Sequence, residues 1–535
     1  MRPLIVDALA SGRGKRQATR DVIGAGPRSL AGVLEGEGMK PQITVAETVL
    51  DGELDLGDFD FLLASGMTTD LQAIRRVTST WKKTSGSPVL VGGPVASEPE
   101  RSLTKTYADI SVIGEGEQTL KELLELGLHR GRLPDPEVLK RVRGITYFDG
   151  VVHFNPLRPA MRRREYDSLV PSTATIVDYP LFRSSRVYVE ALRGCSNYGR
   201  ARIAADTKIC EGCRRCDEGD LEGRYDCPQG ISPGCGYCSV PSLFGPPKSR
   251  SADKIVQEVE ELLSRGVKRV VLSAPGFLDY GRDLLVEPRP LTDPRHPEPN
   301  YQILDELLSK LSELSGFQDR KASFFIENMK GNLVTERAAE ILGRHLEGTP
   351  VNVGFETGSM THTAQLGRAS TPEENLKAVL RLKREGLRPY VYFIHGLPGQ
   401  NPENARETVE TIDRCVASGA SRIILYRFQP LPMSAFHGMP KAPPAEKDLI
   451  GKSIYRAAQR ANRTLKENLV GQTVRVVIAE RYRRDKRFHV AYPLHHGPVV
   501  LVEGFEGSEG SVVDVEIVGV VSDRMVRGRL CDGMF

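Results

Sequence analysis

Cysteine placement constrains this chain more than any other feature. Seven of its nine cysteines fall between residues 195 and 238, while Cys415 and Cys531 stand apart and are expected to be structural thiols. Crowding of this kind in a long chain indicates metal or iron–sulfur ligation rather than disulfide bonds. The segment is therefore expected to fold around a bound metal group. The seven cysteines are Cys195, Cys210, Cys213, Cys216, Cys227, Cys235 and Cys238.

The remaining composition indicates a globular chain of roughly three or four domains. Of its 535 residues, 40% are hydrophobic and 27% are charged, which argues against extended disorder. No run of about 20 uninterrupted apolar residues occurs, and the N-terminus becomes polar too early for a signal peptide. We therefore expect a cytoplasmic protein without a membrane partner.

The first part of the chain, residues 1–130, alternates short apolar runs with helical patterns. This alternation predicts an α/β domain with a parallel, doubly wound, Rossmann-like sheet. Several of its strands end in small residues, at the sheet edge where such folds bind ligands. The residues concerned are Ser65, Gly92, Gly93, Gly114 and Gly116.

The rest of the chain divides into four further segments. Residues 131–184 contain a hairpin signal around Asp149-Gly150 and are expected to connect two domains. A second strand and helix alternation over 185–440 predicts a complete or partial (β/α) barrel, and 441–466 predicts a linker helix. The last segment, 467–532, contains short apolar runs separated by glycine-containing turns, a pattern that predicts short strands and a small all-β barrel of the OB kind.

The cysteine spacing suggests a division into four and three. Cys210, Cys213, Cys216 and Cys227-Pro228 match the ferredoxin-type run of cluster ligands, with a longer gap before the last cysteine. Cys195, Cys235 and Cys238 remain, and three thiolates would leave one iron of a cubane free to bind a substrate or cofactor. Spacing alone does not choose between zinc and iron–sulfur, so a zinc ribbon built from four of the seven stays open.

Around the three remaining cysteines the sequence resembles the radical S-adenosylmethionine (SAM) superfamily, in its cobalamin-binding (class B) and methylthiotransferase branches. RGC195 and PGC235-GYC238-SVP look like two halves of the family signature, separated by 39 residues where the family has three. Residues 196–234 are therefore interpreted as an insertion with its own cluster. VGFETGSMTHTAQLGRAST and YFIHGLPGQNPENARETVETI resemble further family elements, with Gln400 where the family has Glu.

The resemblance implies two 4Fe–4S clusters, SAM, and an electron donor such as ferredoxin or flavodoxin. In the family, one electron reaches the three-cysteine cluster, SAM is cleaved, and the 5′-deoxyadenosyl radical abstracts a substrate hydrogen. The resemblance places Tyr237 near adenine, Glu356 and Arg368 facing SAM, and Ser273 near the methionine moiety. It assigns no further catalytic residue.

The N-terminal domain resembles the cobalamin-binding domain of the class B branch, whose loops cradle the corrin. The D-x-H-x-x-G cobalt-ligating motif is absent, and no histidine precedes His129. The resemblance therefore implies cobalamin held by the small-residue loops without a protein ligand on cobalt.

The C-terminal segment resembles the TRAM module of RNA-modifying enzymes. Between Arg475 and His489 six Lys or Arg residues face two acidic residues, a balance of +4, with Tyr482 and Phe488 among them. Cations interleaved with aromatic rings suit RNA with little sequence readout, so RNA, most plausibly tRNA, is the expected partner. The expected RNA-binding residues are Arg481, Arg483, Arg484, Lys486 and Arg487.

Together these features predict a radical SAM enzyme that modifies RNA by methylation or methylthiolation at an unactivated carbon. One alternative is a cobalamin-dependent radical SAM methylase of a protein side chain or small metabolite. Another is a zinc-ribbon RNA-binding protein without catalysis.

Overall fold

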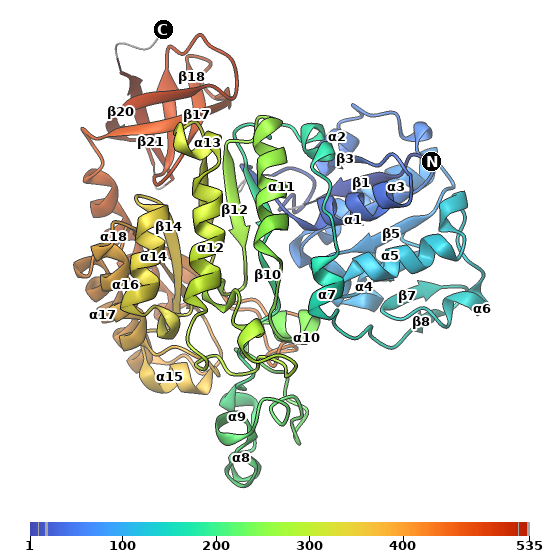
Figure 1. The fold of residues 1–535 in the computed structure, drawn as a ribbon, viewed down its shortest axis with the longest axis horizontal. Helices are drawn as coiled ribbons and strands as arrows, with labels where there is room; N and C mark the ends of the chain where they lie inside the picture. The colour runs from blue at the N-terminus through green and yellow to red at the C-terminus, as the bar shows by residue number, and fades with distance from the viewer. Residues whose placement is uncertain (9, 17–19, 523, 532–535) are drawn as a thin grey trace. The chain divides into compact units, whose positions relative to one another are not determined.

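The computed structural model describes residues 1–8, 10–16, 20–522 and 524–531, and helices and strands alternate along most of them (Figure 1). The chain divides into two units, Met1–Val189 with Glu260–Val267, and Glu190–Val259 with Lys268–Phe535. Among the described residues, no helix has the length and apolar character needed to cross a membrane.

The first unit contains a sheet built from short runs of aliphatic residues. Parallel strands follow the order β3-β1-β4-β5-β6, so the strand order reverses at β1, and open α/β sheets bind ligands at such a reversal. The strands are β1 (Leu4–Asp7), β3 (Gln42–Val45), β4 (Leu62–Ser65), β5 (Val89–Gly92) and β6 (Ile110–Val112). Its helices include α1 (Gly26–Gly36), α3 (Leu71–Thr84) and α5 (Gly116–Glu125). The Rossmann-like expectation is confirmed.

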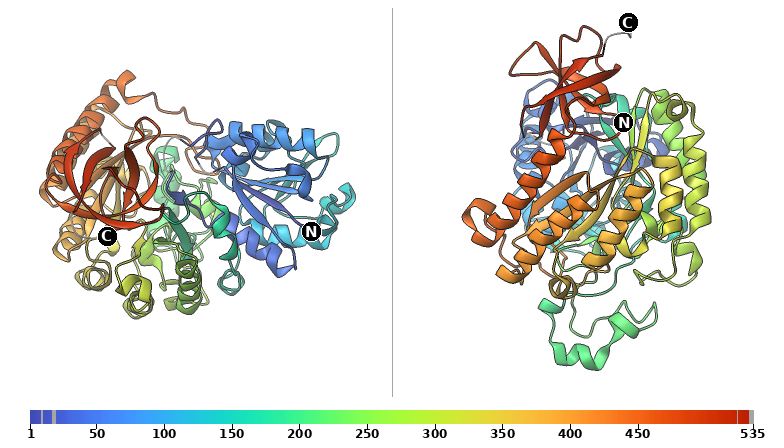
Figure 2. Two further views of the ribbon diagram at one scale, coloured as in Figure 1. Left: turned by 90° about the horizontal axis from the view of Figure 1, so that it is seen from above. Right: turned by 90° about the vertical axis from the view of Figure 1, so that its left-hand side faces the viewer.

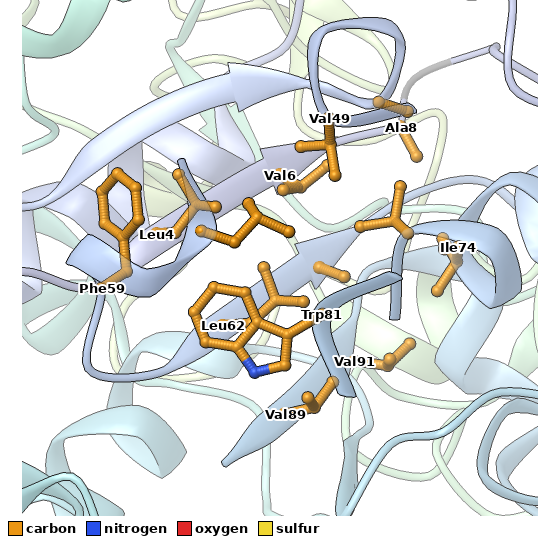
Figure 3. Close-up of a cluster of buried hydrophobic side chains, with 14 of the residues drawn as sticks. Leu4, Val6, Ala8, Val49, Phe59, Leu62, Ile74, Trp81, Val89 and Val91 are labelled. Carbon is orange, nitrogen blue, oxygen red and sulfur yellow. The ribbon is translucent and has the colours of Figure 1, made fainter. Parts of the chain in front are cut away.

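Burial of one helix face fixes α3 on this sheet. Trp81 is fully buried and packs among side chains of three strands, including Leu4, Leu62 and Val89 (Figure 3). Its indole Nε1 donates a hydrogen bond to the Ser87 carbonyl at 3.1 Å, which satisfies the one polar atom of the ring.

The hairpin of the expected connecting segment is part of this sheet. β7 (Ile145–Phe148) pairs antiparallel with β6, and β8 (Val152–Phe154) pairs with β7 around Asp149-Gly150. The turn was predicted correctly, but its strands extend the sheet edge, because β6 offers backbone groups that only a further strand satisfies.

The second unit contains a run of parallel strands with helices between them. β12 pairs with β13, an isolated bridge joins Met329 to Val353, and β14, β15 and β16 follow in order. The strands are β12 (Arg269–Ser273), β13 (Ser323–Ile326), β14 (Pro350–Glu356), β15 (Arg388–His395) and β16 (Arg422–Arg427). Helices α12 (Tyr301–Ser312), α14 (Glu336–Leu346), α16 (Pro372–Arg384), α17 (Pro402–Ala417) and α18 (Leu449–Glu467) lie between or after them. This is the expected α/β architecture, with its carboxyl strand ends on one edge.

A closed barrel follows α18, with strand order β17-β18-β19-β21-β20 (Figure 2). It comprises β17 (Thr473–Arg481), β18 (Phe488–Pro493), β19 (Val499–Glu503), β20 (Val512–Val520) and β21 (Met525–Leu530) around a valine-rich core. The small barrel is therefore confirmed as a fold, and its expected end at residue 532 lies outside the described residues.

The loop after β18 attaches this barrel to the amino ends of the core strands. The Ser323 hydroxyl at the start of β13 donates to the Leu494 carbonyl, and Tyr390 Oη lies 2.8 Å from His496 Nδ1. Arg269, at the start of β12, lies 5.4 Å from the Tyr492 ring. The barrel thus contacts the amino ends of these strands, whereas Ser273 and Glu356 lie at the carboxyl ends of β12 and β14.

Candidate functional site

The structure brings Cys195, Cys235 and Cys238 together. All three are partly buried and free of disulfides. Burial, and then the charges of Cys235 and Cys195, raise the pKa of Cys238 to about 12, and burial also raises the pKa of Cys195. Thiols placed in this way would lose their protons on binding iron, because a coordinated thiol is deprotonated.

Residues that sequence reasoning missed hold the two halves of this cysteine set together. Asn197 Nδ2 lies 3.4 Å from Cys235 Sγ and donates to the Gly367 carbonyl at 2.9 Å. The Asn197 backbone N–H donates to Cys195 Sγ at 3.5 Å. One asparagine thus links both halves of the split signature. In the sequence, only its position two residues after Cys195 could have indicated this role.

Gly236 lies where no side chain fits. A Cβ on this residue would lie 2.3 Å from the Phe436 ring, and the Gly236 carbonyl accepts a hydrogen bond from the Phe436 N–H. The Gly236 N–H in turn donates to the Leu366 carbonyl at 2.9 Å. The cysteine loop therefore lies directly against the segment that carries Arg368.

Glu356, Arg368 and Tyr237 form one buried cluster beside the cysteines. Arg368 donates to the Tyr237 hydroxyl and to the Gly354 carbonyl, and its Nη1 lies 3.2 Å from Glu356 Oε1. Burial raises the pKa of Glu356 against the opposing effect of Arg368, and burial raises the pKa of Tyr237. Three of the four residues expected to face SAM therefore meet.

The backbone of Glu356 is strained. Its φ is +64°, and the register of β14 on β15 shifts between Gly354 and Glu356. A non-glycine residue in this region costs about 1–3 kcal/mol, and such residues concentrate at functional sites. The fourth expected residue, Ser273, ends β12, and its hydroxyl donates to Glu327 at 2.8 Å.

A buried ionic network follows Cys195 directly. Arg282 Nη1 lies 2.5 Å from Asp279 Oδ1, Lys330 ion-pairs with the other carboxylate oxygen, and Ser196 Oγ lies 3.0 Å from both oxygens. The side chains of Asp279 and Arg282 are fully buried. Burial raises the pKa of Cys195, Lys330 opposes that rise and Asp279 adds to it, so the network places charges of both signs beside that thiol. No spacing in the sequence signalled these residues.

The other four cysteines line a separate hollow in the insertion that carries α8 (Thr207–Cys213) and α9 (Arg215–Glu218). The insertion projects from the core (Figure 1). Gln229 Nε2 donates to Cys210 Sγ at 3.2 Å, and buried Arg200 donates to Cys216 Sγ at 3.6 Å. The hollow is also lined by Arg202, Arg214 and Arg215. Asp217 and Asp226 also line it, Arg202 is paired with Asp217, and Arg214 is paired with Glu218. The hydrogen bonds of Gln229 and Arg200 to two thiols are of the kind that orient cluster ligands.

The donor sets fit the groups expected for them. In the described part of the chain, no three His, Cys, Asp or Glu side chains lie close enough to hold a single metal ion. A cubane does not require that arrangement, because each of its cysteines binds a different iron atom.

The insertion is anchored to the core by its own contacts. Arg224 and Asp293 form an ion pair at 3.0 Å, and the Thr292 hydroxyl donates to the Leu221 carbonyl at 2.5 Å. Arg282 of the buried network donates to the Asp293 carbonyl at 3.2 Å. A continuous set of contacts therefore runs from Cys195 to the insertion.

In the first unit, the small-residue loops lie at the carboxyl ends of adjacent strands. Ser65 ends β4, Gly92 ends β5, Gly114 follows β6, and Gly116 begins α5. Gly93 has φ +80°, and a Cβ there would lie 3.0 Å from the Gly66 carbonyl oxygen and from Ser65 Oγ. Gly93 therefore lets the loops after β4 and β5 pack directly on each other at the carboxyl edge of the sheet, which is the edge where open α/β folds bind ligands.

The basic run lies in the turn between β17 and β18, at the opposite end of β18 from the loop that contacts the core. Arg487 is paired with Asp485 at 2.7 Å, and both Arg487 and Arg527 lie over the Phe488 ring, at 5.7 and 5.3 Å. The Phe488 ring already has cationic partners. The residues expected to bind RNA, among them Arg481, Arg483, Arg484 and Lys486, are exposed.

Comparison with known proteins relates the chain to methanogen proteins along its whole length. It is 41% identical to "Uncharacterized protein MK0932" of Methanopyrus kandleri, over 98% of this chain and 95% of that one. It is 39% identical to "Uncharacterized protein MJ1620" of Methanocaldococcus jannaschii, over 99% and 98%. The tRNA-2-methylthio-N(6)-dimethylallyladenosine synthase of Clostridium beijerinckii is 23% identical over 59% of this chain and 66% of its own length.

Solved structures share the fold. The radical SAM methyltransferase TsrM from Kitasatospora setae, with cobalamin and a 4Fe–4S cluster bound, has a TM-score of 0.58 at 15% identity and covers 83% of this chain and 79% of that chain. The cobalamin-dependent radical enzyme OxsB, with aqua-cobalamin bound, has a TM-score of 0.55 at 16% identity and covers 82% and 54%.

The model of the Radical SAM superfamily matches residues 225–412, which include Cys235, Cys238, Glu356 and Arg368. That match and the shared fold agree with the converging cysteines described above. The chain contains a radical SAM domain and belongs to one family with the proteins of Methanopyrus kandleri and Methanocaldococcus jannaschii.

Proposed function

We propose that this radical SAM enzyme carries two 4Fe–4S clusters and modifies RNA, with tRNA as the substrate class, by methylation or methylthiolation at an unactivated carbon. The observation that carries the proposal is the division of the cysteines. Three meet beside Glu356 and Arg368, and the other four line a separate hollow.

In this proposal Cys195, Cys235 and Cys238 hold the SAM cluster, and the hydrogen bonds of Asn197 fix two of them. A bound cluster with SAM supplies the 5′-deoxyadenosyl radical. Glu356, Arg368 and Tyr237 bind the adenosine part of SAM, with Arg368 holding both partners in one buried position. Ser273, oriented by Glu327, lies at a strand end suited to the methionine part.

Cys210, Cys213, Cys216 and Cys227 hold the auxiliary cluster in this proposal. These four thiolates would close the coordination of the cluster, which would then serve electron transfer or the ordering of the insertion rather than SAM binding. An exposed insertion suits contact with a small electron donor of the ferredoxin or flavodoxin class.

RNA as substrate is supported by the relative from Clostridium beijerinckii, a synthase of a methylthiolated tRNA nucleoside. The exposed cations at the β17–β18 turn support it by charge, since phosphate contacts dominate affinity for RNA.

A second candidate is a cobalamin-dependent methylase of a protein side chain or small metabolite. It is favoured by the strand order of the first unit and by the fold shared with TsrM and OxsB. Ser65, Gly92, Gly93, Gly114 and Gly116 would then hold cobalamin without a ligand on cobalt. Anaerobic reconstitution with hydroxocobalamin should give stoichiometric corrin absorbance, and no binding would favour methylthiolation or another cobalamin-free reaction.

Two cysteine variants test the division of the cysteines. Cys195→Ala should abolish reductive formation of 5′-deoxyadenosine and keep the auxiliary cluster. Cys213→Ala should lose about half the iron and keep SAM binding. If Cys195→Ala still forms 5′-deoxyadenosine, or Cys213→Ala loses all iron, the assignment of three and four is wrong.

The substrate class needs its own experiment. Mass spectrometry of tRNA nucleosides from a deletion strain should show one modified nucleoside missing. An unchanged nucleoside profile would favour the second candidate.

A further inference from the structure

The sheet that carries Glu356 also presents a pair of stacked tyrosines. Tyr392 of β15 and Tyr426 of β16 have ring centroids 5.8 Å apart at an interplanar angle of 23°. Tyr426 is 54% exposed although it lies within a strand. An accessible large aromatic ring held in place by a second ring is a common feature of binding surfaces.

Alternation along β15 shows which face the pair occupies. Val391, Phe393 and His395 are buried, while Tyr392 and Ile394 between them are only partly covered. The register places Ile394 opposite Tyr426 and Gly354 opposite Tyr392. Both rings therefore lie on the less covered face of the sheet.

This face leads directly to the SAM-site residues. Arg368, which holds Glu356 and Tyr237, also donates to the carbonyl of Gly354, the register partner of Tyr392. Neighbouring strands are about 4.8 Å apart. The tyrosine pair is therefore one to two strands from Glu356, within reach of a substrate whose carbon must meet the radical.

Cations gather toward the amino end of the same strands. Arg422 is the register partner of Tyr390 and lies 5.7 Å from its ring, and Arg388 lies two residues before Tyr390. In the described part of the chain, neither arginine forms an ion pair with a carboxylate.

The environment of His496 reflects this cationic charge. The imidazole Nδ1 lies 2.8 Å from Tyr390 Oη. Burial, followed by the charges of Arg388, Arg422 and Lys383, lowers the pKa of His496 to about 4. The imidazole is therefore neutral at ordinary pH, and the arginines keep a net positive charge that suits an anionic ligand.

We propose that this face binds a single-stranded segment of RNA, with a nucleobase stacked on Tyr426 and the phosphate backbone held by Arg422 and Arg388. The inference rests on the proposed RNA function and names the surface that presents the substrate to the radical site. Tyr426 and Arg422 are four residues apart on β16, about 13 Å. That span exceeds one base and its own phosphate, so a strand fits this face better than a free mononucleotide.

Binding of a fluorescein-labelled single-stranded oligoadenylate to the full-length holoenzyme, followed by fluorescence anisotropy, tests the proposal. Tyr426→Ala should weaken binding about tenfold, within the usual effect of removing a stacked base, and Tyr426→Phe should bind like the parent. Arg422→Gln should reduce the log–log salt slope by about 0.7, the contribution of one phosphate. Tyr107→Ala is the matched control, because Tyr107 is similarly exposed at 48% in the other unit.

The outcomes separate the alternatives. Adenosine 5′-monophosphate should compete poorly, and competition as strong as that of the oligonucleotide would mean a free nucleotide site. Binding unchanged in both Tyr426→Ala and Arg422→Gln, or weakened equally by Tyr107→Ala, would overturn the proposal. If the parent itself fails to cleave SAM reductively, the proposed radical function fails while the binding result stands.

Discussion

Replacing Asp279 by Asn tests whether the buried ionic network beside Cys195 stabilises the second unit. Asp279 and Arg282 are fully buried, and Lys330 is 13% exposed. An asparagine keeps the shape but leaves two buried cations without their shared anion. Removing one partner of a buried ion pair costs about 3–5 kcal/mol, because the remaining charge is buried without compensation. We therefore expect a loss of that size in the free energy of unfolding.

The single tryptophan of the chain makes the assay specific. Trp81 is in the first unit, so its fluorescence reports that unit, while far-UV circular dichroism reports both. In urea, Asp279→Asn should shift the dichroism transition and leave the Trp81 transition in place. Asp305→Asn, which removes the partially exposed pair with Arg344, is the control and should cost under about 1 kcal/mol.

The pH dependence has a definite sign. Burial opposes ionisation of Asp279, but Lys330 and Arg282 outweigh it, so the pKa of Asp279 lies below its ordinary value. Its stabilisation is present above the unfolded-state pKa of about 3.9 and is lost as pH falls through the lower folded-state pKa. Asp279→Asn should therefore lose less stability than the parent on acidification through this range. A variant within about 1 kcal/mol of the parent at neutral pH would refute the reasoning.

Three further predictions follow. Trp81→Ala should cost about 3–5 kcal/mol by dichroism, because it empties a packed core, and an unchanged transition would contradict the packing of α3. Burial raises the pKa of Glu356, so this carboxyl group stays protonated to a higher pH in the folded state than in the unfolded state. The free energy of unfolding should therefore fall as pH rises above the unfolded-state pKa of about 4.3, and Glu356→Gln should reduce that fall in urea titrations. Replacing four arginines by Gln should lower the salt slope of RNA binding by about 2, since one of them is already paired with Asp485, and an unchanged slope would exclude the β17–β18 turn. The four are Arg481, Arg483, Arg484 and Arg487.

Short-range sequence patterns predicted those parts of the fold that depend on neighbouring residues in the chain. Alternating apolar runs gave the parallel sheet, and Asp149-Gly150 gave the hairpin turn. The pairing of β7 with β6 was missed, because strand pairing depends on which edge is open in the folded sheet.

Some residues of the candidate site could also be predicted from the sequence, and others could not. Cysteine spacing predicted the two sets, and the resemblance gave Tyr237, Glu356 and Arg368, which the structure brings together. Asp279 and Lys330 come from loops 51 residues apart, and they meet only because β12 and β13 are neighbours. Contacts fixed by strand order leave no periodic pattern in a sequence.

If RNA is the substrate as proposed, the position of the small barrel limits how it can reach the radical site. Its contacts fall at Ser323 and Tyr390, near the amino ends of β13 and β15, whereas Glu356 ends β14. Tyr390 lies three residues before Phe393, the register partner of Glu356, which is about 10 Å along β15, and the basic turn lies at the far end of β18, whose six residues span about 20 Å. Cations on the barrel alone therefore cannot position a nucleotide for hydrogen abstraction. The face with Arg422 and Tyr426 extends from the level of Tyr390 to that of Ile394, between the barrel contact and Glu356. In the proposed function, the barrel would therefore contribute affinity for RNA, and this face would position the nucleotide.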